Sequence, residues 1–129
     1  MSQAINRIFL VGRLGADPEL RRTQSGQAVL RCRLATTSRW RDKDGELQER
    51  TDWHTVVLWG RRGEALSRLL GKGERIGVEG RLRSRQWQTP EGERRTSVEV
   101  EATDVVLLGE GRRRAAPADA GDEADPLPF

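Results

Sequence analysis

Two stretches of the chain alternate apolar and polar residues with a period of two, and this pattern constrains the fold more than any other feature. In the first, residues 28–40, four apolar residues occupy every second position, with Arg31 and Arg33 between them. The second, residues 51–59, continues the alternation. Successive side chains of a strand point to opposite faces, so each stretch is predicted to be a strand with one buried face. The polar loop between them, centred on Asp44-Gly45, predicts a hairpin.

Three more strands are predicted on either side of this hairpin. They cover residues 5–14 and 96–108, which are rich in β-branched and other apolar residues, and residues 75–83, which Gly77 and Gly80 interrupt. Gly12 inside the first of them suggests a bend in a long strand. After a turn, residues 19–23 are predicted to continue it as a short strand. The chain is therefore predicted to be all-β with five main strands.

One short helix is predicted at residues 64–70, where four apolar residues fall at helical spacing and Gly71 ends the pattern. This helix lies between the third and fourth main strands. Five strands with a helix at that place have the element order of an OB-fold barrel. A five-stranded sandwich would show similar alternation, but the position of the helix favours the barrel, and glycines inside strands suit its curvature.

Charge divides the chain into three parts. Residues 1–109 hold 20 basic and 15 acidic residues, residues 110–118 resemble a short linker, and residues 119–129 hold four acids and no base. The last part cannot bury enough apolar surface to fold alone, so the tail is predicted to be disordered. It nevertheless ends on an apolar ring beside a carboxylate, at Phe129. Solubilisation and capture by a partner's pocket are equally open interpretations of this acidic tip.

Several function classes are disfavoured by the sequence. The single cysteine, Cys32, cannot form an internal disulfide and is predicted to lie in the core, which is compatible with a reducing cytoplasm. The N-terminus has no signal-peptide pattern, and the apolar runs are too short to span a bilayer. We find no P-loop, metal-ligand spacing or nucleophile–base pair, so we expect no enzyme activity, no cofactor and no metal. The lone histidine, His54, is predicted to be structural.

The four tryptophans all lie beside charged residues. Aromatic rings interleaved with arginine suit single-stranded nucleic acid, because bases stack on rings while cations follow the phosphates. Trp40 and Trp87 lie at strand ends beside cations and are predicted to stack on bases. Trp53 and Trp59 lie in the middle of a strand, where core packing and stacking are equally consistent with their positions.

Six stretches in fixed order carry a more specific signal. They are Asn6 to Glu19, Leu34-Ala35-Thr36, Trp40-Arg41-Asp42, Thr51 to Leu58, Leu70-Gly71-Lys72-Gly73 and Val78 to Leu82. In this order and spacing, the chain resembles the bacterial single-stranded DNA-binding protein (SSB) family over Ile5 to Leu108, and again at its C-terminal tip. The resemblance implies a non-enzymatic OB-fold homotetramer that binds and protects single-stranded DNA, without sequence preference, in replication, recombination and repair.

The resemblance also implies roles for individual residues. It adds Trp53 and Trp59 to the DNA contacts, although the family often has Phe at the position of Trp59. Gln86 stands where the family is often basic, and we expect neighbouring arginines to compensate. His54 takes a position that lies at a subunit interface in the family. The expected DNA-binding residues are Trp40, Trp53, Trp59, Trp87, Arg21, Lys43, Arg61, Lys72, Arg83 and Arg85.

The C-terminal tip of the family binds replication, recombination and repair proteins. The matching residues here are Asp122, Glu123, Asp125, Pro126, Leu127, Pro128 and Phe129. Ala124 interrupts the acidic run, and the linker is short for the family. The resemblance, together with the lack of a signal-peptide pattern, implies a cytoplasmic, nucleoid-associated protein. Two alternatives stay open: a specialised paralogue for DNA uptake or recombination, and an OB-fold RNA-binding module.

Overall fold

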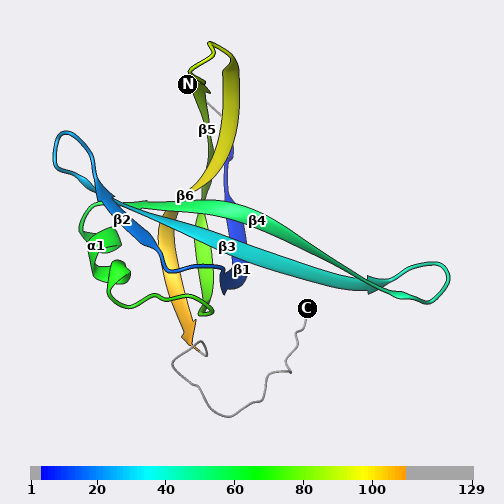
Figure 1. The fold of residues 1–129 in the computed structure, drawn as a ribbon. Helices are drawn as coiled ribbons and strands as arrows, with labels where there is room; N and C mark the ends of the chain where they lie inside the picture. The colour runs from blue at the N-terminus through cyan, green and yellow to red at the C-terminus, as the bar shows by residue number, and fades with distance from the viewer. Residues whose placement is uncertain (1–3, 110–129) are drawn as a thin grey trace.

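The computed structural model describes residues 4–109, and these form one sheet and one helix (Figure 1). The predicted linker and acidic tip, residues 110–129, lie outside the described residues. The elements in chain order are β1 (Ile8–Leu14), β2 (Glu19–Arg22), β3 (Ala28–Arg41), β4 (Leu47–Trp59), α1 (Arg61–Ser67), β5 (Arg75–Gln88) and β6 (Arg94–Gly109).

The sheet closes on itself into a barrel of five strands. The strand order is β1-β5-β6-β4-β3, and β3 returns to β1 through the pairs Arg13↔Ala35 and Leu14↔Leu34. All neighbours are antiparallel except β4 and β6, which run parallel. The short strand β2 pairs with β3 outside this ring. The predicted five-stranded OB-fold barrel, with its helix between the third and fourth main strands, is thereby confirmed.

The even-numbered residues of β3 fill the barrel, as the alternation predicts. Leu30, Cys32 and Leu34 are buried, and Val56 on β4 and Ile76 on β5 meet them in the core. Arginines at the odd positions of β3 are left on the outside. Burial raises the pKa of the Cys32 thiol to about 11, so this residue is an inert apolar side chain of the core rather than a reactive one.

The helix begins three residues earlier than predicted and ends three residues earlier. It starts directly after Gly60, whose φ of 78° reverses the chain at the end of β4, a conformation that favours glycine. The apolar pattern nevertheless continues past Ser67, because Leu69 and Leu70 remain in turns that bond back to the carbonyl of Leu66. Leu66 and Leu70 are buried against the core.

Two long hairpins project from the barrel (Figure 1). The β3–β4 ladder continues to the pair Arg41↔Leu47, and the β5–β6 ladder continues to Gln88↔Arg94. The fourth main strand is predicted to end at residue 83, and this end is wrong, because β5 continues to Gln88. Residues 81–88 of β5 are all exposed, so neither face of this part of the strand packs on a core. Without a core, no alternation of apolar and polar residues marks it as a strand.

Two strand glycines permit close approach of neighbouring backbones. A methyl group on Gly12 would overlap the carbonyl oxygen of Ala35, and one on Gly80 would overlap that of Glu101. The ladder between β5 and β6 shifts register between Glu79 and Gly80. At Gly12, where a bend is predicted, the neighbouring strands therefore lie too close to leave room for a side chain.

The first predicted strand also begins later than expected, at Ile8 rather than residue 5. Asn6 instead uses its side chain to take the place of a strand residue beside β5. Its Nδ2 donates to the carbonyl of Leu82 at 2.9 Å, and its Oδ1 accepts from the amide of Leu82 at 3.0 Å. The side-chain amide thus satisfies the backbone groups of β5 where β1 does not reach them.

Candidate nucleic-acid interface

The outer wall of β3 and β4 combines tryptophan and arginine because of the register between the two strands. Arg31 lies opposite Val57, Ala35 opposite Trp53, and Val29 opposite Trp59. Residues opposite each other in a ladder share a face, so the odd positions of both strands face the outer wall, where Val57 is nevertheless buried, while the even positions face the core. One wall therefore presents Arg31 and Arg33 together with Trp53 and Trp59.

All four tryptophans are exposed, with between 42% and 51% of their surface accessible. Trp53 and Trp59, which the alternation left open between core and surface, both lie outside the core. An indole ring exposes a large apolar area, and keeping four of them in contact with water is costly unless something covers them. The rings are therefore available to stack on a ligand.

Trp53 is held between two neighbours. The guanidinium carbon of Arg33 lies 5.3 Å from the centroid of the Trp53 ring, which is within the range of a cation–π contact. Gly15, in the loop after β1, lies against the ring atoms Cζ3 and Cη2 and leaves no room for a side chain of its own. Arg33 was not among the expected site residues, although its place in the alternation already put it on the outer face.

The β5–β6 arm extends the same wall. Arg83, Arg85 and Trp87 occupy alternate positions of β5, opposite Glu99, Ser97 and Arg95 of β6. A shallow groove of about 120 Å³ lies between this arm and β4. Its lining consists of Val57, Trp59, Arg83, Ser84, Arg85, Glu99 and Glu101. Three of the expected contacts, Trp59, Arg83 and Arg85, are thus brought together around one groove.

Two glutamates of β6 neutralise part of this wall. Glu99 contacts Arg31 at 3.1 Å and Arg85 at 3.6 Å, and Glu101 contacts Arg83 at 3.1 Å and Arg81 at 3.4 Å. Sequence reasoning missed both glutamates, because a β-strand with alternating acids is typical of any solvated face. Only the register between β5 and β6 shows that each acid lies between two arginines.

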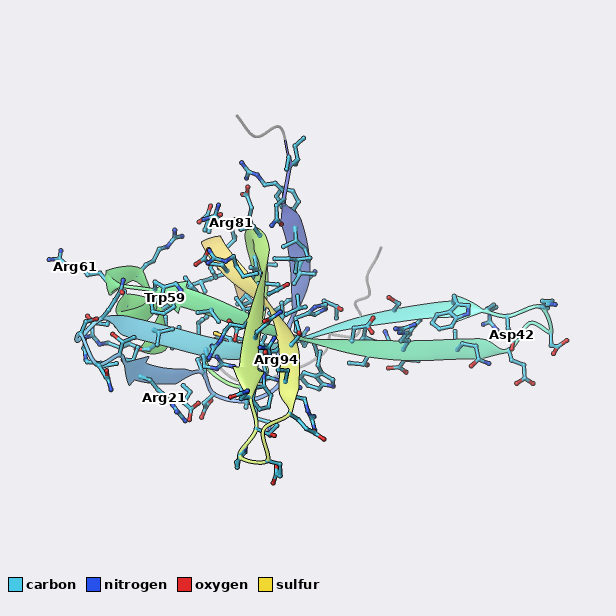
Figure 2. The ribbon with its side chains drawn as sticks, turned by 90° about the horizontal axis from the view of Figure 1, so that it is seen from above. Arg21, Asp42, Trp59, Arg61, Arg81 and Arg94 are labelled. Atoms are coloured by element: carbon cyan, nitrogen blue, oxygen red, sulfur yellow. The ribbon has the colours of Figure 1, made fainter. Side chains whose placement is uncertain are left out.

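Trp40 and Lys43 lie away from the groove, toward the end of the β3–β4 arm. Trp40 pairs with Gln48 and takes an even position of β3, so it lies on the other face of the ladder from Trp53. Lys43 is exposed in the turn that joins the two strands. Asp42 marks the tip of this arm in Figure 2. The structure therefore does not place Trp40 and Lys43 beside the other expected contacts.

The remaining expected cations are distributed around the end of the barrel that carries the helix. Figure 2 shows Arg61, Trp59 and Arg21 near this end. Arg61 is the first residue of α1, two positions after Trp59, and Arg21 on β2 pairs with Glu19 at 3.0 Å. Lys72 is exposed in the loop before β5, where its backbone amide donates to Asp17 Oδ1 at 2.8 Å.

His54 is partly buried and faces the core side of the β3–β4 ladder. Its Nε2 lies 2.9 Å from the hydroxyl of Thr36. In the described range, 4–109, no group of three or more His, Cys, Asp or Glu residues could hold a metal ion. Over the same residues, no helix is long and apolar enough to cross a membrane.

A closed five-stranded barrel whose outer wall carries exposed rings between cations is an OB-fold module of the nucleic-acid-binding class. The sequence comparison defines the group more closely. Residues 5–108 match the model of the Single-strand binding protein family, and the chain belongs to this family.

Named relatives agree with this assignment. Single-stranded DNA-binding protein 1 of Chlorobaculum tepidum is 42% identical over 110 residues, which cover 84% of this chain and 68% of that protein. The single-stranded DNA-binding protein of Xanthomonas axonopodis pv. citri is 43% identical over 109 residues, covering 84% of this chain. The aligned part spans only 61% of that relative, so the match concerns the barrel more than the whole of the longer protein.

A solved structure shows the same fold. The Plasmodium falciparum SSB, determined in complex with single-stranded DNA, superposes with a TM-score of 0.76 at 31% identity. The match covers 84% of this chain and 99% of that one. The fold of the aligned part of this chain is therefore also the fold of a protein that was determined in complex with single-stranded DNA.

Proposed function

We propose that this protein binds single-stranded DNA without sequence preference and protects it during replication, recombination and repair. The observation that carries the proposal is the outer wall on which Trp53 and Trp59 lie exposed beside Arg31 and Arg33. Membership of the Single-strand binding protein family and the names of the relatives support DNA as the polymer.

The chemistry of this wall suits stacking rather than base reading. Each base that stacks on an aromatic side chain contributes about 1–3 kcal/mol, and this energy is largely independent of the base. The arginines beside the rings supply charge for the phosphates. Arg33 restricts the ring of Trp53 before DNA arrives, which lowers the entropy lost on binding. The proposed contacts are Trp40, Trp53, Trp59, Trp87, Arg21, Lys43, Arg61, Lys72, Arg83 and Arg85.

A homotetramer is part of the proposal, and an apolar surface on another wall of the barrel supports it. Phe9 and Val11 of β1 lie exposed on the same face as Val106 and Leu108 of β6, with Gly77 of β5 between them. A contiguous apolar surface of this kind favours contact with a second copy of the chain.

The edge of β1 supports the same assembly. β1 pairs with β5 along its length but with β3 only at Arg13 and Leu14, so the second edge of residues 8–11 has no strand partner within residues 4–109. An open edge beside exposed apolar side chains favours strand pairing with another subunit. We place His54 at a further subunit contact of the tetramer, following the resemblance.

We further propose a non-enzymatic, cytoplasmic and nucleoid-associated protein that recruits partner proteins through residues 122–129. The chemistry of the tip, acidic residues followed by Pro-Leu-Pro-Phe, supports capture by a basic pocket with an apolar floor. Partners would be proteins of replication, recombination and repair. These residues lie outside the described range, and it is their sequence that supports this part of the proposal.

A titration of intrinsic tryptophan fluorescence with dT oligomers tests the proposed function. We expect strong quenching and binding that weakens steeply as salt rises. An rU oligomer of equal length separates DNA from RNA binding, and tighter binding of rU would favour the RNA module instead. A chain ending at Pro117 should keep full DNA binding. Absence of quenching by any oligomer would overturn the proposal.

A further inference from the structure

The groove beside Trp59 contains an acid in a place where a DNA-binding wall needs positive charge. The side chain of Glu99 is only 14% exposed, and its carboxylate contacts both Arg31 and Arg85. Arg31 comes from β3 and Arg85 from β5, so the carboxylate joins two arginines from opposite sides of the β4–β6 seam. This negative charge would not increase the affinity of the wall for DNA.

We propose that Glu99 is an internal substitute for a DNA phosphate, which sets the affinity and salt dependence of the wall. This inference rests on the proposed function. In the free protein the carboxylate holds Arg31 and Arg85 turned toward one point. When DNA binds, a phosphate takes over one or both arginines, and the ion pair with Glu99 is exchanged rather than added.

Two consequences follow from an exchange. The net gain per arginine is smaller than for a free cation, because the pair with Glu99 must be given up. The bound strand also leaves more easily, because the carboxylate stays within the groove and competes for the arginines as soon as a phosphate withdraws. Glu99 is thus an affinity-limiting residue, and it favours a DNA complex that can move or be displaced.

Glu101 repeats the arrangement two residues further along β6, at the next position on the same face. It contacts Arg81 and Arg83, and its side chain is 25% exposed. The repeat indicates that the pairing of acids with this arginine row is a property of the wall rather than an isolated contact. Glu101 also provides a second variant for the test. Its side chain is more exposed than that of Glu99, so the loss of its charge should disturb the fold less.

The test compares the full-length protein with Glu99→Gln, Glu101→Gln and the control Glu64→Gln. The control removes the same charge from an ion pair with Arg22, and neither Glu64 nor Arg22 lines the groove. Binding of a dT oligomer is measured by tryptophan quenching over a series of salt concentrations. At low salt we expect Glu99→Gln to bind roughly three- to tenfold more tightly than the control. We expect its log–log salt dependence to steepen by about 0.7 for each additional phosphate that the released arginines neutralise.

A second measurement separates electrostatic exchange from a change in folding. In a protein that already carries Arg31→Gln and Arg85→Gln, the addition of Glu99→Gln should leave affinity and salt slope unchanged. Thermal unfolding by circular dichroism checks that each variant is folded, and Glu101→Gln gives the same readout if Glu99→Gln unfolds.

Three outcomes would contradict the inference. Equal slopes for Glu99→Gln and Glu64→Gln would show that only net charge matters. Weaker binding by both groove variants would show that the acids merely hold the arginines in place. If the unaltered protein fails to bind dT, the proposed function falls and this inference falls with it; if it binds but the variants match the control, only this inference fails.

Discussion

Gly15 lies directly against the indole ring of Trp53, with no space for a methyl group between them. The glycine is in the loop after β1 and the tryptophan in the middle of β4, so two distant parts of the chain set the position of one ring. The backbone of Gly15 is not in the left-handed region, which means that the glycine serves the ring rather than a turn. The nearest obstacle to a larger residue is the far end of a side chain.

We therefore expect Gly15→Ala to move the Trp53 ring without unfolding the barrel. The ring can swing away from the new methyl group, so the loss of stability should stay within about 1 kcal/mol. Binding of dT should weaken although Gly15 is not among the proposed DNA contacts. The emission spectrum of tryptophan and the dT affinity, measured together, check this. Unchanged affinity with a shifted spectrum would remove Trp53 from the contacts.

Stacking predicts a graded response at Trp53, Trp59 and Trp87. Replacing any one of them by alanine should cost about 1–3 kcal/mol of dT binding, and replacement by phenylalanine should cost less. Leu69→Ala is a suitable control, since Leu69 is a similarly exposed apolar residue on the helix side of the barrel. Losses of equal size in the alanine variants and the control would point to folding rather than stacking. Isothermal titration of each variant gives the affinities.

Two glycines of β5 form a matched pair for stability. A methyl group on Gly80 would overlap the backbone of Glu101 and Ala102, whereas one on Gly77 would meet its nearest neighbours at 3.8–3.9 Å, an ordinary contact distance. Gly80→Ala should lower the free energy of unfolding by about 1–3 kcal/mol or more, because backbone must shift. Gly77→Ala should change it by less than about 0.5 kcal/mol. Urea unfolding followed by circular dichroism compares the two, and similar losses would contradict this interpretation of the wall.

The turn of the β3–β4 arm should depend on pH through Asp42. The amide of Glu46 donates to Asp42 Oδ1 and, with the amide of Asp44 and the side chain of Gln48, holds the pKa of this carboxyl below its usual range. A carboxyl with a lowered pKa in the folded state stabilises the fold above its unfolded pKa, and this contribution is lost as pH falls through the folded value. NMR titration should therefore show the turn loosening only in acid, and Asp42→Asn should show no such transition.

The apolar surface on β1 and β6 predicts the effect of a charge on assembly. Phe9→Asp places a carboxylate in the proposed subunit contact, so sedimentation equilibrium should show a smaller species than the unaltered protein. Phe9 is 70% exposed in the single chain, and the barrel itself should therefore remain folded. Glu19→Gln, on β2, changes one charge elsewhere and should keep the assembly. An unchanged mass for Phe9→Asp would move the subunit contact to another surface.

The strands and the barrel were predictable because alternation reports which residues face a core. Leu30, Cys32 and Leu34 lie where the period of two places them, and the helix occupies the expected interval. The prediction failed where no core exists to impose a pattern. The part of β5 beyond Arg83 is exposed to solvent on both faces. It is a strand only because it pairs with β6.

The site was predictable in part for the same reason. Tryptophans beside arginines indicated an aromatic and basic surface, and all four rings are indeed exposed. The partners of those arginines were not predictable, because Glu99 is 68 residues from Arg31 and meets it only through the pairing of β3, β4 and β6. The separation of Trp40 from the other rings likewise depends on ladder register, which a single sequence does not reveal.

The barrel wall has a narrow seam besides the β1–β3 junction, because β4 and β6 are joined by only the two pairs Val56↔Val100 and Val57↔Glu101. The groove beside Trp59 lies over this seam, and Arg31 reaches across it to Glu99. A strand of DNA that stacks on Trp59 and binds the arginines of β5 would fasten both sides together. Binding of DNA would then oppose local separation of β4 from β6. The amides of Val56 and Val57 should therefore exchange with solvent far more slowly once the groove is filled.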